Sequence, residues 1–217
     1  MKLISAYLLL TAFVFSIHAQ HTHFYTGTTN SEVEQSVALC LLDEANGTIQ
    51  LINRMEGGQR PGYITLSNDN NFLYAVSSAG FQGKENENSI HAFALTNEGE
   101  NLQLLKTQSS KGINPCHISV NPVHDIVYAA NYTSGSIVSY AIEENGRLSE
   151  PVSSIQHNGS GPNTERQQGP HAHYIHASPD GKFVYVADLG IDKIMIYKQE
   201  ENGKLVPNKA QEFLEVT

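Results

Sequence analysis

Pro115-Cys-His-Ile-Ser-Val-Asn-Pro-Val-His-Asp-Ile-Val-Tyr-Ala-Ala130 is one of three segments of the chain that align with one another without a gap. The other two are Pro61–Val76 and Ala172–Ala187, and a partial copy begins at His23. All the copies share a tyrosine at one position, namely Tyr25, Tyr74, Tyr128 and Tyr185. A repeat of roughly fifty residues is typical of the blades of a β-propeller and is longer than that of most helical repeat proteins.

Each repeat divides into four short runs rich in Val, Ile, Tyr and Phe, separated by Gly, Asn, Pro and Asp. In the last repeat we predict strands at Ala172–Ala177, Phe183–Ala187 and Lys193–Lys198, with a fourth inside Val206–Val216. No stretch shows a sustained helical period. Four antiparallel strands per repeat make one propeller blade, so the sequence predicts an all-β propeller.

The number of blades is just under four. Residues from His23 to about Glu56 supply strands two to four of a first blade, and three four-stranded blades follow. Propellers have four to eight blades, so we expect the chain to be the N-terminal part of a longer protein, about half of a ring. A compact four-bladed closure is the alternative, and the missing innermost strand of the first blade argues against it.

Residues 1–19 have the layout of a secretory signal peptide, with a basic start, an apolar run at 8–15 and small residues before Gln20. We therefore predict removal of residues 1–19, a propeller domain at 20–217, and export to the periplasm or the cell exterior. A retained membrane anchor is the alternative. No other membrane segment is expected.

The overall charge is −9 and no cluster of basic residues occurs, which makes nucleic acid an unsuitable partner. The two cysteines, Cys40 and Cys116, each lie in an apolar, strand-like run. We expect two buried thiols, although export would permit a disulfide.

The up-and-down course of a blade sorts the polar residues between its two ends. The loop entering strand one and the loop between strands two and three share one end, and strand one borders the central channel. One rim of the channel is therefore expected to carry His117, Asn131, Arg166, Gln167, His171, His173 and Asp188. His124 and Asp180 fall at the opposite end. His171 and His173, two residues apart on a strand, are expected to share a face.

Residue chemistry suggests roles for this group. The Arg166 guanidinium suits an oxyanion, and Gln167 and Asn131 are further candidates for substrate binding. His117, His171 and His173 can act as general bases or oxyanion donors, and Asp188 can orient a histidine or activate water. No Gly-x-Ser-x-Gly elbow supports a serine nucleophile. Water attack on an ester-type carbonyl is the simplest chemistry for the set, with Arg166, the three histidines and Asp188 as the catalytic candidates.

Each candidate also has a purely structural interpretation. Asp188 can cap a turn, His117 and His173 can be channel residues bonded to neighbouring backbone, and Arg166 can be solvated. The pair His171 and His173 could begin a metal site, but no third ligand is evident nearby. We predict no metal and no cofactor.

Three motifs resemble those of the propeller-type lactonases. They are Pro115-Cys-His-Ile-Ser-Val-Asn-Pro122, Gly161-Pro-Asn-Thr-Glu-Arg-Gln-Gln-Gly-Pro-His-Ala-His173, and Ser178-Pro-Asp-Gly-Lys-Phe-Val-Tyr-Val-Ala-Asp-Leu-Gly190. That family includes the bacterial propeller 6-phosphogluconolactonase and the fungal carboxymuconate-lactonizing enzyme. The resemblance implies a seven-bladed ring, a metal-independent lactonase or cycloisomerase, and a site at the channel mouth. The residues that match family motif positions on the rim are His117, Arg166, His171 and His173.

The sequence thus predicts hydrolysis of a sugar lactone, such as 6-phosphogluconolactone or a related cyclic ester. In this hypothesis Arg166 grips an anionic substituent and a rim histidine activates water. Export favours an unphosphorylated sugar lactone or another cyclic ester over a cytosolic intermediate. The alternatives are an exported, non-catalytic propeller that binds a carbohydrate or a protein, and an inactive, truncated fragment.

Overall fold

The computed structural model describes residues 21–29 and 33–216. The predicted signal peptide and its boundary with the propeller domain lie outside these residues. Within them the chain forms sixteen strands in four antiparallel sheets and three 3₁₀ turns, at Val33–Gln35, Glu85–Glu87 and Asn97–Gly99. None of these helical turns is long and apolar enough to cross a membrane. The predicted all-β class is confirmed.

The four sheets are successive blades, and their strands pair in sequence order. The first blade contains β1 (His21–Gly27), β2 (Val37–Asp43) and β3 (Thr48–Met55). The second contains β4 (Ile64–Leu66), β5 (Phe72–Ser77), β6 (Ser89–Thr96) and β7 (Asn101–Ser109). The third contains β8 (Pro115–Val120), β9 (Ile126–Asn131), β10 (Ser136–Ile142) and β11 (Leu148–Gln156). The fourth contains β12 (Ala172–Ala177), β13 (Phe183–Asp188), β14 (Lys193–Gln199), β15 (Leu205–Pro207) and β16 (Phe213–Glu215).

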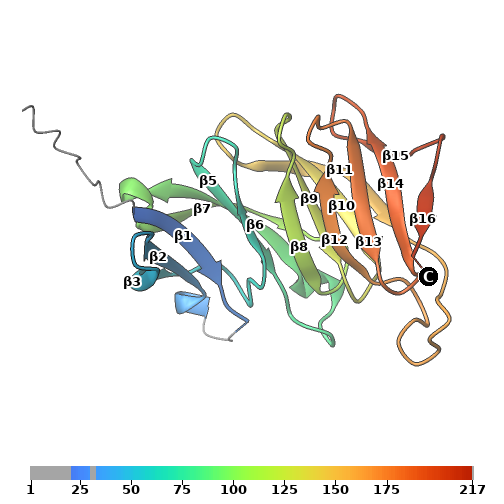
Figure 1. Cartoon of the computed structure of the whole chain (residues 1–217), viewed down its shortest axis with the longest axis horizontal. Coiled ribbons are helices and arrows are strands. Elements are labelled where there is room, and N and C mark those ends of the chain that lie inside the picture. Colours follow the sequence, from blue (N-terminus) through green and yellow to red (C-terminus); the bar gives the residue numbers. More distant parts are fainter. Residues whose placement is uncertain (1–20, 30–32, 217) are drawn as a thin grey trace, which may run out of the picture.

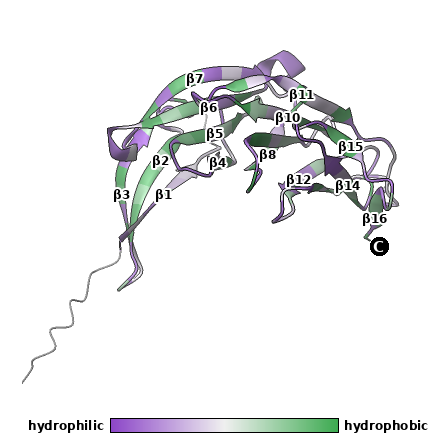
Figure 2. Cartoon of the chain, turned by 90° about the horizontal axis from the view of Figure 1, so that it is seen from above, coloured by the Kyte–Doolittle hydropathy of each residue, from purple (hydrophilic) through white to green (hydrophobic). Residues whose placement is uncertain are grey.

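The blades follow one another along an arc rather than a closed ring (Figure 1). Seen from above, β4, β8 and β12 lie on the concave side of the arc, while β7 and β11 lie on the convex side (Figure 2). The first described blade has three strands, as predicted, and the predicted fourth strand of the last blade is divided between β15 and β16, which both pair with β14. The innermost strands therefore line one concave surface, which corresponds to the channel of a propeller.

The turn that joins the first two strands of each complete blade is built by side chains. In the fourth blade Ser178 Oγ donates to Asp180 Oδ1 at 2.6 Å and accepts from the Phe183 amide at 3.0 Å. Ser67 accepts in the same way from the Phe72 amide in the second blade. These hydroxyls replace water as partners of the turn backbone, so they fix where strand two begins.

The repeated tyrosine joins neighbouring blades. Tyr25 donates its hydroxyl to the Gly99 carbonyl of the next blade at 2.8 Å, and Tyr74 donates to the Gly146 carbonyl at 3.1 Å. Tyr74 and Tyr128 are fully buried in the apolar interfaces between blades. Each ring packs in the core between two sheets and each hydroxyl finds a partner, which gives the repeated tyrosine a structural role.

Tyr185 differs from the rest of the series. It occupies the same position of the fourth blade, yet its side chain is 40% exposed because no further described sheet packs against that face. Leu214 and Val216 on the same blade are also exposed. The repeated tyrosine therefore lies in the core only where a neighbouring sheet covers it.

Candidate functional site

One end of the arc gathers the residues that the sequence assigned to a rim. β8 begins beside the end of β9, where Pro115 pairs with Asn131, and β12 begins beside the end of β13, where Ala172 pairs with Asp188. We call this end of the third and fourth blades, with the loops that enter β8 and β12, the site rim. His124 lies in the turn between β8 and β9, at the opposite end.

A β-bulge opens both inner strands at the site rim. The register shifts between Ala172 and Tyr174 in β12 and between Pro115 and His117 in β8. In β12 the bulge leaves His173 and Tyr174 exposed in succession, which breaks the usual alternation of a strand. The extra residue thus changes the direction in which the side chains at the start of the strand point.

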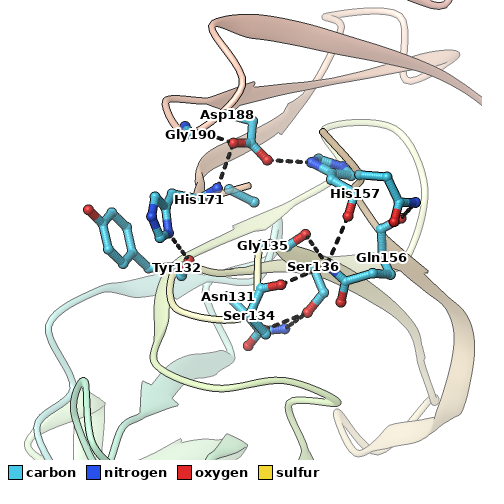
Figure 3. A network of polar contacts seen from close by, with 12 residues as sticks. Asn131, Tyr132, Ser134, Gly135, Ser136, Gln156, His157, His171, Asp188 and Gly190 are labelled. Carbon is cyan, nitrogen blue, oxygen red and sulfur yellow. Dashed lines mark hydrogen bonds and ion pairs between the residues drawn. The ribbon is translucent and has the colours of Figure 1, made fainter. Parts of the chain in front are cut away.

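Asp188 is the centre of the polar network at the rim (Figure 3). Its side chain is 2% exposed, and its Oδ1 accepts from the His171 amide at 2.6 Å and from the Gly190 amide at 3.0 Å. Its Oδ2 accepts from His157 Nδ1 at 2.6 Å. These contacts hold the backbone of His171 against the end of β13, and the carboxylate itself is buried.

The backbone before His171 packs directly on the turn that follows β13. A side chain at Gly190 would place its Cβ 2.1 Å from the Gly169 carbonyl oxygen and 2.6 Å from the His171 amide nitrogen. Such contacts cannot relax without moving the main chain. Glycine at position 190 therefore lets Asp188 and the loop ending at His171 approach each other.

Tyr132 contacts both histidines at the exposed part of the rim. Its ring stacks on the His171 ring, with centroids 4.6 Å apart, and meets the His173 ring edge-on at 5.6 Å. Its carbonyl oxygen is 3.0 Å from His171 Nδ1. Because a carbonyl only accepts, Nδ1 carries the proton and Nε2 of the neutral ring keeps a lone pair. Both rings contact Tyr132, but His171 precedes β12 and the register shift interrupts the alternation from which their common face was predicted.

Arg166 is exposed and reaches back to the same tyrosine, with a long 3.5 Å contact from Nη2 to the Tyr132 hydroxyl. It forms no ion pair with any carboxylate in the described part of the chain. Its neighbour Gln167 is instead used by its own loop, because its amide donates to the Leu189 carbonyl and accepts from the Asn163 amide, both at 2.8 Å. The Arg166 guanidinium thus has no carboxylate partner among the described residues. The Gln167 amide, in contrast, is hydrogen-bonded within its own loop and to the turn after β13.

His117 lies between the ring of Tyr63, which directly precedes β4, and the ring of Tyr174 in β12. Its ring centroid is 4.1 Å from that of Tyr63 and 4.3 Å from that of Tyr174, and its side chain is 4% exposed. Nδ1 accepts from the Ile175 amide at 3.4 Å, and Nε2 has no partner in the described residues. Burial, helped by the nearby His176 and His173, lowers the pKa of His117 to about 4. The ring is therefore neutral near pH 7.

We expect His117 to make the folded protein sensitive to acid. Its pKa is about 4 when folded and returns to about 6.5 on unfolding, so between these values the unfolded chain binds more protons. Stability is fully present above this range and falls as the pH drops through it. The free energy of unfolding should decrease by about 2–3 kcal/mol from about pH 7.5 to about pH 4.5. Urea unfolding at both pH values measures the change.

His117→Gln should lose this part of the pH dependence, because glutamine still accepts from the Ile175 amide and does not titrate. His124→Gln, a change at an exposed site on the opposite end, should keep it. An equal pH dependence in wild type and His117→Gln would contradict the assignment.

Asn131 is fully buried. Its amide donates to the Ser110 carbonyl at 2.9 Å and to Ser136 Oγ at 3.1 Å. These bonds tie the loop entering β8 to the third blade. The side chain lies at the predicted rim but is buried beneath its surface. Its surroundings therefore give no support to the predicted contact with a substrate.

Sequence reasoning missed two residues of the network. Tyr132 follows strand two directly, and the end of strand two was already placed on the rim, so its position was a usable signal. His157 was not identifiable, because it lies 31 residues before Asp188 in a loop with no periodic pattern. In the described residues no three His, Cys, Asp or Glu side chains converge as metal ligands do. Cys40 and Cys116 are free thiols, as expected, although Cys116 is only partly buried.

The fold and the rim together define a β-propeller whose channel end presents an arginine and a histidine beside one tyrosine. The model of the family described as "Lactonase, 7-bladed beta-propeller" matches residues 23–216, and the chain belongs to this family.

The chain is also similar to known proteins in sequence and in fold. The chain is 35% identical over 153 residues to the 6-phosphogluconolactonase of Bacillus subtilis, an alignment that covers 70% of this chain and 42% of the relative. It superposes with a TM-score of 0.81 and 29% identity on a candidate 6-phosphogluconolactonase from Bacteroides fragilis, over 91% of this chain and 55% of the other. The periplasmic gluconolactonase PpgL of Pseudomonas aeruginosa, 21% identical with a TM-score of 0.80, covering 91% of this chain and 56% of its own, shares the fold. The chain spans about half the length of these proteins.

Proposed function

We propose that the protein is a lactonase that hydrolyses the cyclic ester of a sugar acid. The observation that carries the proposal is the grouping of Arg166 and His171 on Tyr132, with His171 held by Asp188. The relatives named above are described as acting on 6-phosphogluconolactone or gluconolactone. A phosphorylated or unphosphorylated gluconolactone is therefore the first substrate to test.

In the proposed reaction a water molecule attacks the lactone carbonyl carbon. His171 Nε2 takes a proton of that water, the ring C–O bond breaks, and the protonated His171 returns this proton to the departing alkoxide, so that the product is an open-chain hydroxy acid. General base catalysis of this kind contributes about 10²–10⁴-fold. The hydrogen bond from Nδ1 to the Tyr132 carbonyl supports the role, because it leaves Nε2 as the basic atom.

Arg166 is proposed to stabilise the carbonyl oxygen as it becomes an oxyanion. The sequence alone suggested that this guanidinium grips an anionic substituent. Its contact with the hydroxyl of the tyrosine that stacks on His171 instead favours a position beside the base, where the reacting carbonyl must lie. We also propose that the protein acts outside the cytoplasm, on the strength of the N-terminal sequence pattern.

Arg166→Ala should lower kcat/KM for gluconolactone hydrolysis by about 10²–10³-fold, the usual cost of removing one oxyanion donor. The assay is proton release in weak buffer with spontaneous hydrolysis subtracted, on the full-length protein that the gene encodes. Arg147→Ala is the control, since Arg147 is exposed in the hairpin turn between β10 and β11 at the opposite end. Unchanged activity of Arg166→Ala would remove the residue from the mechanism. A wild type that binds gluconate without hydrolysing any lactone would instead indicate a binding module.

A further inference from the structure

The loop that carries Arg166 is closed at its neck by one carboxylate. It runs from His157 to His171, between β11 and β12. Asp188 binds His157 Nδ1 with one oxygen and the His171 amide with the other, both at 2.6 Å (Figure 3). A surface loop whose two ends are held together is compact, and such loops frequently carry function. The neck alone does not place the guanidinium, because Arg166 lies near the middle of the loop.

Gln167, the residue after Arg166, fastens the middle of the loop to the fourth blade. Its side-chain Nε2 donates to the Leu189 carbonyl at 2.8 Å and to Asp192 Oδ1. Both acceptors lie in the turn that joins β13 to β14, directly after Asp188. One turn of the fourth blade therefore holds the loop at its neck and again beside the arginine.

The oxygen of the same side-chain amide shapes the loop itself. Gln167 Oε1 accepts from the Asn163 amide at 2.8 Å, and the Gln167 backbone amide donates to the Asn163 carbonyl at 2.7 Å. Asn163 Oδ1 accepts from the amides of Glu165 and Arg166, at 3.1 and 3.2 Å. A Cβ at Gly161 would lie 2.4 Å from Gln167 Oε1, so the loop packs closely on this amide. Arg166 thus belongs to a hydrogen-bonded turn that Gln167 closes.

The bonds of Gln167 determine where the guanidinium can reach. The side chain of Arg166 is exposed, and its 3.5 Å contact with the Tyr132 hydroxyl is too long to hold it firmly. Its position is therefore set mainly by the backbone that the adjacent glutamine fastens. Placement matters for an oxyanion donor, because a displacement of about 1 Å can cost about 10²-fold in rate.

We infer that Gln167 is a positioning residue of the candidate active site. Its amide clamps the middle of the loop to Leu189 and Asp192, and the clamp holds the Arg166 guanidinium beside the proposed base. The catalytic consequence of the clamp rests on the proposed function, whereas the clamp itself concerns the loop alone. The sequence suggested substrate binding for Gln167, and we propose the positioning role in its place.

Trypsin cleavage after Arg166 tests the clamp without any turnover. In the full-length protein that the gene encodes, Gln167→Ala should raise the rate of cleavage at this bond about tenfold or more, because cleavage follows the population of the opened loop. Mass spectrometry identifies the fragment, and a synthetic peptide of residues 157–171 with the same change corrects for the altered sequence. Gln168→Ala, the same change at the next and exposed residue, should leave the rate unchanged. Asp192→Asn should also leave it unchanged, because asparagine keeps the acceptor oxygen and tolerates the φ of +51° at that position.

A double-mutant cycle tests the catalytic consequence. Gln167→Ala should lower kcat/KM for gluconolactone hydrolysis about tenfold or more in the wild-type background. It should have no further effect in Arg166→Ala, because the clamp acts through the arginine. A glutamine that only stabilises the fold would instead give the same factor in both backgrounds. Asp192→Asn should retain the wild-type rate.

Wild-type cleavage kinetics in Gln167→Ala, or a loss of activity of equal size in both backgrounds, would overturn the inference. If Gln167→Ala does not fold, Gln167→Glu gives the same comparison, because its carboxylate accepts from the Asn163 amide but has no proton to donate to Leu189 or Asp192. The two proposals also fail separately. A protein that hydrolyses no lactone but is cleaved faster in Gln167→Ala keeps the clamp and loses the proposed function. A lactonase whose Gln167→Ala variant is cleaved no faster keeps the proposed function and loses the clamp.

Discussion

Replacing Asp188 by alanine is expected to lower the free energy of unfolding by about 3–5 kcal/mol, because several buried hydrogen-bond donors lose their acceptor at once. The carboxylate is 2% exposed and accepts from His157, from the His171 amide and from the Gly190 amide. Its removal leaves all three donors without their partner in a dry environment, and an unsatisfied buried polar group costs about 1–3 kcal/mol by itself. Urea unfolding near neutral pH, followed by tyrosine fluorescence and circular dichroism, measures the loss.

Glu201→Ala is the control, because Glu201 is an exposed acidic residue of the same blade and forms no side-chain ion pair among the described residues. Its unfolding midpoint should stay close to that of wild type. A double-mutant cycle with His157→Leu separates the pair from its surroundings, since the two changes together should cost clearly less than the sum of the single changes. Additive losses would show that His157 and Asp188 are neighbours without an energetic coupling.

The blade architecture could be predicted because local sequence patterns determine the strands and the turns. The aligned repeats gave four strands per blade, the serine, asparagine and glycine residues marked the turns, and the meander alone placed His117, Asn131, Arg166, Gln167, His171, His173 and Asp188 at one end. Such patterns suffice when each element contacts mainly the element before and after it.

The sequence could not predict how deeply each residue at that end is buried. Asn131 and Asp188 end β9 and β13, directly before Tyr132 and Leu189, yet the first two are buried and engaged by backbone. The difference depends on loops, because the long loop between β11 and β12 brings His157 to Asp188 and the loop entering β8 brings Ser110 to Asn131. Contacts of this kind have no period in the sequence, so a polar side chain expected at the surface can lie beneath it.

The tyrosine repeat illustrates a second limit. An identical position was buried in two blades and exposed in the fourth, because burial requires a neighbouring sheet and the sequence of one blade does not contain it.

His171→Gln is expected to reduce kcat/KM for lactone hydrolysis by about 10²–10⁴-fold, the contribution of a general base. Glutamine has a similar length and can donate to the Tyr132 carbonyl as Nδ1 does, while the Asp188 contact uses the backbone amide, which the substitution leaves in place. The change therefore removes the basic nitrogen and spares the scaffold. Steady-state kinetics on the full-length protein measures the loss.

His173→Gln provides the comparison that isolates the base, because His173 meets the same Tyr132 ring but is exposed and stands in the bulge of β12. Its substitution should raise KM more than it lowers kcat, as expected for a residue that contacts substrate without transferring a proton. If the two variants exchange these effects, His173 is the base and His171 its neighbour. If neither changes the rate while Arg166→Ala does, water is activated by a group outside this pair, and the chemistry of the rim reduces to binding the oxyanion.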